Sequence, residues 1–156
     1  MIVFLAGNGN ETILFSDEVL AHFEKFRQYG PKQHEAGGQL FANLSEGQVH
    51  VAKATGPNAN DKRNRFSFLI DRWQARTDII KLHKQGLHYV GDWHTHPEAF
   101  PKPSSADVAA ISDLVKSSRH SLGGFLMVIV GTAEGTDGLY VGISDGIDVK
   151  RILPDY

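Results

Sequence analysis

The residues best suited to chemistry are two histidines and an aspartate close together in the chain. The segment Gly-Asp-Trp-His-Thr-His-Pro occupies residues 91–97, and Asp107 follows it. Residues 87–90 predict a β-strand, so His94 and His96, two positions apart, should project from the same face. Two imidazole nitrogens and one carboxylate oxygen suit Zn²⁺, and three protein ligands leave a fourth coordination position open for water. We therefore predict a catalytic zinc site held by His94, His96 and Asp107.

The residues after the second histidine are expected to place Asp107 at the start of a helix. Pro97 cannot donate to a β-ladder and should end the strand, and Ser104 is a suitable N-cap. Asp107 then lies in the first helical turn, where free backbone amides and the helix dipole favour an anionic group. Simpler alternatives stay open: the histidines could mark a half-exposed strand end, and Ser104 with Asp107 could be only a capping box.

The order of these residues is similar to the signature of a known family of proteases. His-x-His-Pro, six residues and then Ser-x-x-Asp resembles the motif of the JAMM metalloproteases, whose domains are also called MPN-plus or JAB domains. That family has an additional upstream glutamate, and Glu35, at the start of Glu-Ala-Gly-Gly-Gln-Leu-Phe, matches it. The resemblance covers nearly the whole chain. It is closest to the short prokaryotic JAB proteins, which include deconjugating proteases of CBASS antiphage operons.

This resemblance implies catalytic roles for two residues and a class of substrate. Glu35 would act as general base on the attacking water and as general acid toward the departing nitrogen, and the Ser104 hydroxyl would help to stabilise the oxyanion. The implied activity is that of a zinc-dependent isopeptidase or peptidase that cleaves after the C-terminus of a conjugated protein. The expected partner is a protein with a flexible C-terminal tail, either a ubiquitin-like protein or a CBASS cyclic-nucleotide synthase. Processing of another ubiquitin-like carrier protein is the alternative.

Other functional classes need residues that this sequence lacks. A zinc nucleobase deaminase requires a Pro-Cys-x-x-Cys ligand pair, and the chain contains no cysteine. The His-Glu-x-x-His motif of zincin proteases and the nucleophile elbow of serine hydrolases are also absent. The remaining rival is a non-catalytic MPN-type scaffold that binds partners. Proteins of that kind lose the ligand pattern, which this sequence keeps.

Composition indicates an ordinary globular domain. The chain has 156 residues, is 41% hydrophobic and 22% charged, and carries a formal net charge of −2. We expect one domain over residues 1–156, with no general electrostatic reason to bind nucleic acid. Apolar runs are too short to cross a bilayer, and residues 1–6 lack the basic region of a signal peptide. Together with the missing cysteines, this favours a cytoplasmic protein without a membrane role.

Hydrophobic patterns predict an α/β fold. Strands are expected at 1–6, 11–15, 36–42, 48–54, 66–70, 125–130, 139–144 and 147–153, and in the segment before the histidines. Helices are expected at 16–30, at 71–86 and from Ser104 onward, with Trp73, Ile79, Ile80 and Leu82 as the apolar positions of the second. Residues 55–64 are expected to form a polar loop. The pattern favours a single-domain, mixed, largely antiparallel sheet flanked by helices, and the family resemblance implies that this sheet is curved.

Several further residues give weaker predictions. A Gly37-Gly38 pair is unfavourable inside a strand unless a ligand or another backbone comes close, and a substrate chain would be such a ligand; a β-bulge is the alternative. Asp92 shares the predicted face of His94 and could orient an imidazole. The basic residues of 61–65 are expected to be solvated. Structural or solvated roles are expected for the other histidines, His22, His34, His50, His83, His88 and His120.

Overall fold

The computed structural model of the chain describes residues 1–117 and 123–156, so His120 lies outside the described residues. The described residues form a nine-stranded sheet in the order β10-β9-β8-β7-β3-β4-β2-β1-β11. In chain order its strands are β1 (Ile2–Ala6), β2 (Glu11–Phe15), β3 (Gly37–Ser45), β4 (Gln48–Ala54), β7 (His88–Thr95), β8 (Phe125–Val130), β9 (Leu139–Ser144), β10 (Val149–Arg151) and β11 (Leu153–Pro154). Only the β2–β4 and β7–β8 pairs are parallel among the described residues. The predicted mixed, largely antiparallel sheet is confirmed.

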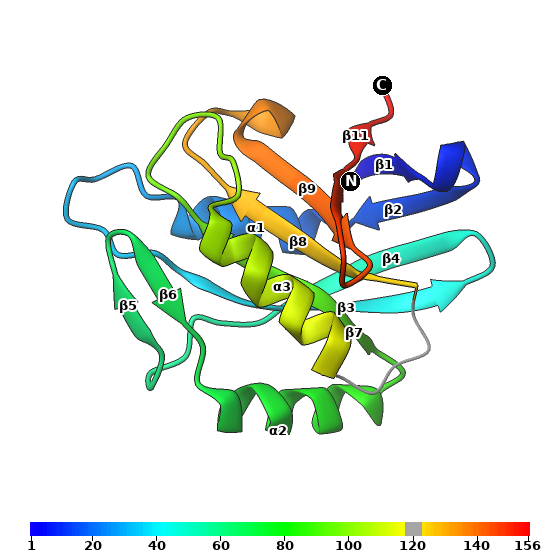
Figure 1. Cartoon of the computed structure of the whole chain (residues 1–156), viewed down its shortest axis with the longest axis horizontal. Helices are drawn as coiled ribbons and strands as arrows, with labels where there is room; N and C mark the ends of the chain where they lie inside the picture. The colour runs from blue at the N-terminus through cyan, green and yellow to red at the C-terminus, as the bar shows by residue number, and fades with distance from the viewer. Residues whose placement is uncertain (118–122) are drawn as a thin grey trace.

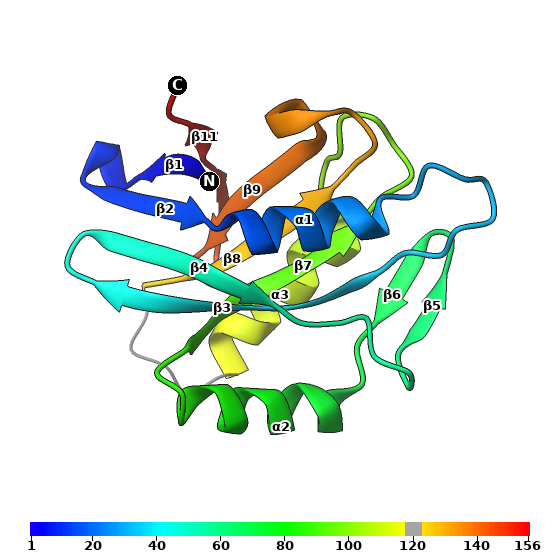
Figure 2. The same ribbon diagram turned by 180° about the vertical axis from the view of Figure 1, so that it is seen from behind.

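The sheet curls so that its two ends are joined by one short segment of chain. Strands β10 and β11 are close in sequence but lie at opposite ends of the strand order (Figures 1 and 2). Between them, the Ile152 amide donates to Val141 of β9; just after β11, the Asp155 amide donates to Val3 of β1. The strand predicted over residues 147–153 is therefore two short strands, because the chain changes partner at Ile152.

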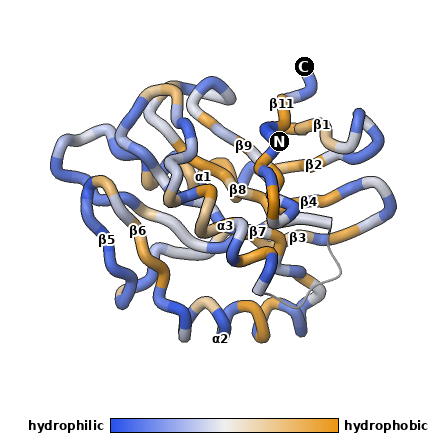
Figure 3. Tube along the Cα trace, in the orientation of Figure 1, coloured by the Kyte–Doolittle hydropathy of each residue, from blue (hydrophilic) through white to orange (hydrophobic). Residues whose placement is uncertain are grey.

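Two helices cover opposite faces of the sheet. Helix α1 (Asp17–Phe26) packs on one face, and α3 (Ser105–Ser117) packs on the other (Figures 1 and 2). The side chains of β8 alternate between these two faces. One set packs in the cluster that contains Val19 and Phe23 of α1, and the other set packs in the cluster that contains Ile111 and Val115 of α3. All six residues of β8 are buried, as expected for a central strand covered on both faces. Figure 3 shows the hydrophobic colouring along these central strands.

A separate two-stranded ribbon replaces part of the expected polar loop. β5 (Lys62–Asn64) pairs with β6 (Ser67–Leu69) in antiparallel register. The turn between them is held by the Asn64 side chain, which accepts a hydrogen bond from the Phe66 amide at 2.9 Å. The loop prediction was wrong for residues 62–64, and the strand predicted at 66–70 is shorter and lies outside the main sheet. β5 is polar and therefore has no hydrophobic strand pattern in the sequence. Backbone pairing, rather than burial of side chains, forms this ribbon.

Two helices differ from their predicted form. Helix α2 (Arg72–His83) buries Leu82, but Trp73 is 76% exposed and Ile80 is 56% exposed, so these two residues were wrongly assigned to the core. Helix α1 ends at Phe26, before the predicted stop at residue 30. The next residue, Arg27, is extended and buried, and its guanidinium donates to the carbonyl groups of residues 131 and 133. None of the described helices is long and apolar enough to cross a membrane.

Candidate metal centre

Strand β7 separates the candidate ligands from the core by simple alternation. Trp93 and Thr95 are buried on one side of the strand, whereas Asp92, His94 and the following His96 are half-buried on the other. Neighbouring strands fix this strand on both sides, with β3 antiparallel and β8 parallel to it. The Trp93 indole donates to the Thr55 carbonyl at 2.9 Å, which further holds the core side in place. The imidazoles therefore project from a rigid element, as the two-residue spacing predicts.

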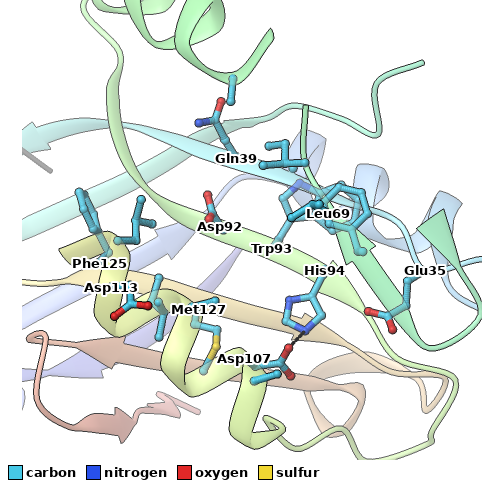
Figure 4. A pocket seen from close by; sticks show the side chains of 18 of the residues that line it. Glu35, Gln39, Leu69, Asp92, Trp93, His94, Asp107, Asp113, Phe125 and Met127 are labelled. Carbon is cyan, nitrogen blue, oxygen red and sulfur yellow. Dashed lines mark ion pairs between the residues drawn. The ribbon is translucent and has the colours of Figure 1, made fainter. Parts of the chain in front are cut away.

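The two imidazoles and Asp107 converge on one point. The Nε2 atoms of His94 and His96 lie 3.1 Å apart. Asp107 reaches both rings from α3, with Oδ1 3.3 Å from His94 Nε2 and Oδ2 3.2 Å from His96 Nε2. Two ligands on one tetrahedral zinc ion, each about 2.0–2.1 Å from it, are about 3.3 Å apart. The three donor groups thus have the chemistry and the spacing that zinc requires. Figure 4 shows Asp107 and Glu35 flanking His94.

Glu35 completes the cluster from the segment just before β3. Its carboxylate and the His94 and His96 rings offer donor atoms that all lie within 4.8 Å of one another. The residue is only 4% exposed. Its backbone is held by the β5 strand, because the Glu35 amide donates to the Asn64 carbonyl and Arg63 Nε donates to the Glu35 carbonyl, both at 2.7 Å. At least one basic residue of 61–65 therefore has an internal contact, although it was expected to be solvated.

A buried hydrogen-bond network ties the Glu35 segment to the histidine strand. The Thr95 hydroxyl accepts from the Ala36 amide at 2.9 Å and donates to Gln28 Oε1 at 2.7 Å. The Thr95 amide donates in turn to the Ala36 carbonyl at 2.9 Å. Gln28 also donates to the carbonyl groups of residues 33 and 65. This network therefore fixes three segments relative to one another: Ala36 beside Glu35, Thr95 between the two histidines, and Gln28 after α1.

The ionisable groups of the cluster perturb one another strongly. Burial alone would raise the pKa of Asp107, but hydrogen bonds from His94 and His96 outweigh it and hold that pKa well below its usual range. Burial alone would lower the pKa of His96, but its hydrogen bonds to Asp107 and Glu98 raise it to about 9. Both pKa shifts show that the cluster stabilises positive charge beside the Asp107 carboxylate.

The pKa of Glu35 is raised to about 7, mainly by burial. The positive charge on His96 opposes this shift, and the Asp107 carboxylate adds to it. A carboxyl group with a pKa near neutral pH can both accept and return a proton at little cost, which suits general acid–base catalysis.

Comparison with known proteins agrees with this geometry. Residues 20–140 match the family described as prokaryotic homologs of the JAB domain. The chain belongs to the prokaryotic JAB family. A CD-NTase/cGAS isopeptidase from Pseudomonas aeruginosa is 33% identical over 147 residues, which are 90% of this chain and 89% of that protein. A protein of the same name from Escherichia coli is 26% identical over 155 residues, covering 97% of this chain and 93% of that protein.

The fold of this JAB protein is also found among solved structures. A solution structure of a protein from Desulfitobacterium hafniense superposes with a TM-score of 0.64 and 20% sequence identity. The match covers 89% of this chain and 88% of that chain. This likeness supports the α/β architecture.

Ser104 of the JAB protein caps α3, as its position predicts. Its Oγ accepts from the Asp107 amide at 3.1 Å, and the Asp107 Oδ2 accepts from the Ser104 amide at 2.9 Å. The two residues therefore form a reciprocal capping arrangement. It leaves the Ser104 hydroxyl proton available, so the capping role and a donor role beside Asp107 are compatible.

Glu98 is a site residue that sequence reasoning missed. Its Oε1 lies 3.0 Å from His96 Nδ1 and also accepts from the Lys102 amide at 3.0 Å. A carboxylate on the second nitrogen of a metal-binding histidine fixes the tautomer and the orientation of the ring. Asp92, expected as a candidate for this role, instead accepts a hydrogen bond from the Tyr89 hydroxyl at 2.6 Å. The position of Glu98 two residues after His96 was the available signal.

The glycine pair after Glu35 serves internal packing. A Cβ atom at Gly38 would lie 1.8 Å from the Thr55 carbonyl oxygen, and one at Gly37 would lie 2.7 Å from the Trp93 carbonyl oxygen. Another backbone therefore makes the close approach that was expected of a substrate chain. The β3 register shifts come later, next to Phe41. The bulge predicted at this pair is therefore wrong, and contact of the pair with a substrate chain stays a prediction.

Four of the other histidines lie in helices and strands that the sequence predicted. His22 is in α1, His83 in α2, His50 in β4 and His88 in β7. His34 is exposed, next to the buried Glu35.

An open groove of about 1500 Å³ runs from the candidate metal cluster across the molecule. Strand β7 contributes to its floor, β6 and α2 line one side, and α3 lines the other (Figure 4). The cluster residues Glu35, His94, His96, Ser104 and Asp107 all line it. The candidate centre is thus accessible to a long, flexible ligand.

Proposed function

We propose that this JAB protein is a zinc-dependent isopeptidase that releases a conjugated protein by cleaving after its C-terminal tail. The proposal rests on the donor atoms of His94, His96 and Asp107, which lie 3.1–3.3 Å apart beside a buried glutamate. Family membership and the isopeptidase names of the relatives support the reaction class. When bound, zinc supplies Lewis acidity and lowers the pKa of water enough to make it a nucleophile near neutral pH.

The protein side chains then have separate tasks in amide hydrolysis. His94, His96 and Asp107 hold the ion, and Glu98 orients the His96 ring through its Nδ1 atom. The Glu35 carboxylate accepts the proton of the attacking water and passes it to the departing nitrogen, since its pKa of about 7 favours neither form strongly. The Ser104 hydroxyl donates to the oxygen that gains negative charge at the carbonyl.

The groove favours an extended chain as substrate. A tail without fixed structure can enter a groove of about 1500 Å³ without local unfolding of its protein. Strand β6 lines the groove, and among the described residues it pairs with β5 alone. Its other edge therefore has no strand partner and could pair with an extended chain. Two relatives are named CD-NTase/cGAS isopeptidases. We therefore propose a conjugated CD-NTase as the substrate, with a ubiquitin-like protein as the alternative.

The test uses a CD-NTase fused through its C-terminus to a reporter protein, with a ubiquitin fusion in parallel. The zinc-loaded enzyme should cut the CD-NTase fusion at the junction. His94→Ala and His96→Ala should each lose both metal and cleavage. Glu35→Gln should keep one zinc per chain and lose most turnover, because proton transfer is removed but no ligand is. Glu46→Gln, an exposed glutamate at the β3–β4 turn, is the matched control and should behave as wild type.

Three outcomes would contradict parts of the proposal. Zinc content near zero in protein purified without chelator would favour the non-catalytic scaffold. Full zinc occupancy in the His94→Ala/His96→Ala double variant would refute the ligand assignment. Cleavage of ubiquitin fusions but not of CD-NTase fusions would leave the chemistry in place and reject the substrate.

A further inference from the structure

The β7–α3 loop (residues 96–104), which carries His96 and Glu98, is fastened to the β8–β9 loop (residues 131–138). The Glu98 carbonyl accepts from the Thr132 amide at 2.9 Å, and the next residue of each loop forms a second such bond at 3.1 Å. The two loops lie side by side beyond the ends of β7 and β8 (Figures 1 and 2). Backbone hydrogen bonds between the two segments therefore continue past the ends of the strands.

The loops also make a close contact at Gly131. A Cβ atom at this position would lie 2.4 Å from the Glu98 carbonyl oxygen and 2.6 Å from Pro101 Cδ. Gly131 and Pro101 are both buried. Glycine in such a place allows another backbone to approach, and a larger residue would push the two loops apart. The position of the Glu98 backbone thus depends on where the β8–β9 loop lies.

Arg27, directly after α1, anchors the β8–β9 loop. Its Nη1 donates to the Gly131 carbonyl at 2.6 Å and to the Ala133 carbonyl at 2.8 Å. Its Nε donates to Glu24 at 2.5 Å. Arg27 is only 5% exposed, and a buried guanidinium requires partners of this kind. The side chain therefore fixes the two residues that flank Thr132, whose amide holds the β7–α3 loop.

Glu98 needs this support because its side chain is 49% exposed. Its Oε1 lies 3.0 Å from His96 Nδ1 and accepts from the Lys102 amide at 3.0 Å. An exposed pair of this kind contributes little by itself, because ordering a flexible side chain costs entropy. A backbone that is already held in place lowers this cost. The contact between Glu98 and His96 thus depends on the anchoring of the two loops.

We propose that Arg27 is a positioning residue for the metal site. It holds the β8–β9 loop, that loop holds the backbone of Glu98, and Glu98 keeps the His96 ring oriented. With Nδ1 beside the carboxylate, His96 presents Nε2 toward His94 Nε2 and Asp107 Oδ2, which are 3.1 and 3.2 Å away. Arg27 acts through the two loops rather than by contact with zinc or substrate. This role rests on the proposed zinc-dependent function.

Zinc affinity, measured by competition with a chelating dye, tests the link. Arg27→Met keeps an unbranched side chain and removes every donor, so zinc should bind about tenfold more weakly than to the wild type. In a Glu98→Ala background, Arg27→Met should change the affinity by no more than about twofold, because both substitutions act on the same contact with His96. Losses that multiply in the double variant would overturn the proposal.

Two further variants separate this role from a general loss of stability. Val51→Ala is the control, because Val51 is fully buried in β4, which β3 separates from β7. It should lower the urea midpoint and leave zinc affinity unchanged. Gly131→Ala moves the same loops without altering α1, so it tests the link if Arg27→Met does not fold. It should weaken zinc binding about tenfold, again with little added loss in the Glu98→Ala background.

Proton NMR of the zinc-loaded protein gives a readout that does not depend on turnover. The His96 Hδ1 proton, held by Glu98, should give a downfield signal that Glu98→Ala removes. Arg27→Met should broaden or remove the same signal, and Val51→Ala should keep it. Wild-type zinc affinity in both Arg27→Met and Gly131→Ala, or an unchanged His96 signal in Arg27→Met, would overturn this role and keep the proposed function. A wild-type protein that binds no zinc would overturn both.

Discussion

Replacing Thr95 with valine should destabilise the protein without removing a ligand or a catalytic group. Thr95 lies between the two histidines, is fully buried, and links the Ala36 amide to Gln28 Oε1 through its hydroxyl. Valine has nearly the same shape, so the change leaves no large cavity. It removes both hydrogen bonds and leaves a buried N–H group and a buried carbonyl oxygen without their partner.

The expected size follows from these two groups. A buried donor or acceptor that loses its partner costs about 1–3 kcal/mol. The Ala36 amide is in the backbone and cannot turn away, whereas Gln28 has a flexible side chain that can relax. We therefore expect Thr95→Val to lower the free energy of unfolding by about 2–4 kcal/mol, a large share of the roughly 5–15 kcal/mol of a typical domain.

Urea unfolding of chelator-treated protein, followed by tryptophan fluorescence, measures this loss separately from metal binding. Thr12→Val is the matched control, because the hydroxyl of Thr12 is near the surface and makes only a 3.4 Å bond to the Gly47 carbonyl. The Thr95→Val loss should be smaller by about 1 kcal/mol in a Gln28→Met background, where one partner is already gone. A Thr95→Val loss below about 0.5 kcal/mol, or equal to that of Thr12→Val, would refute the reasoning.

Three further predictions concern the metal site and its support. Glu98→Gln should weaken zinc affinity by about 10- to 100-fold through loss of the carboxylate on His96, measured by competition with a chelating dye; unchanged affinity would contradict this role. Zinc must displace a proton from His96, whose pKa is raised to about 9, so affinity should fall about tenfold for each pH unit below 9. An affinity that is flat between pH 6.5 and 8.5 would argue against it. Gly38→Ala should cost about 3 kcal/mol or more in urea unfolding, because its Cβ would lie 1.8 Å from the Thr55 oxygen. Gly123→Ala, whose Cβ would have no non-neighbouring atom of the described residues within 4 Å, should be near neutral.

The sequence was most informative where local spacing decides geometry. His94 and His96 are two residues apart in a strand, and Asp107 is three residues after a cap, so strand and helix periods alone predict where these side chains point. Burial on both faces of β8 was also predictable from local sequence, because its six residues form a continuous apolar run. The meeting of α3 with the end of β7 is a tertiary contact; the ligand chemistry of the three residues and the family resemblance anticipated it, whereas strand and helix periods could not.

Features that depend on contacts between distant segments could not be predicted from local patterns. The Thr95–Gln28 bond joins residues 67 positions apart, and the Arg63–Glu35 bond joins residues 28 positions apart. Gly38 requires glycine because of Thr55, and a glycine in a strand does not say which atom approaches it. Trp73 was misassigned because a large apolar residue on a helix is usually buried, while this one is exposed.

The alternation of β7 explains how one strand serves both stability and chemistry. Trp93 and Thr95 face the core and bond to Thr55 and Gln28, whereas Asp92 and His94 face the groove. A one-residue slip of register would exchange these two sets completely. Pairing with β3 on one side and β8 on the other opposes such a slip at every residue from 91 to 94, because each has a partner on both sides. The position of the candidate ligands is thus a consequence of sheet register, which the core contacts of Trp93 and Thr95 help to fix.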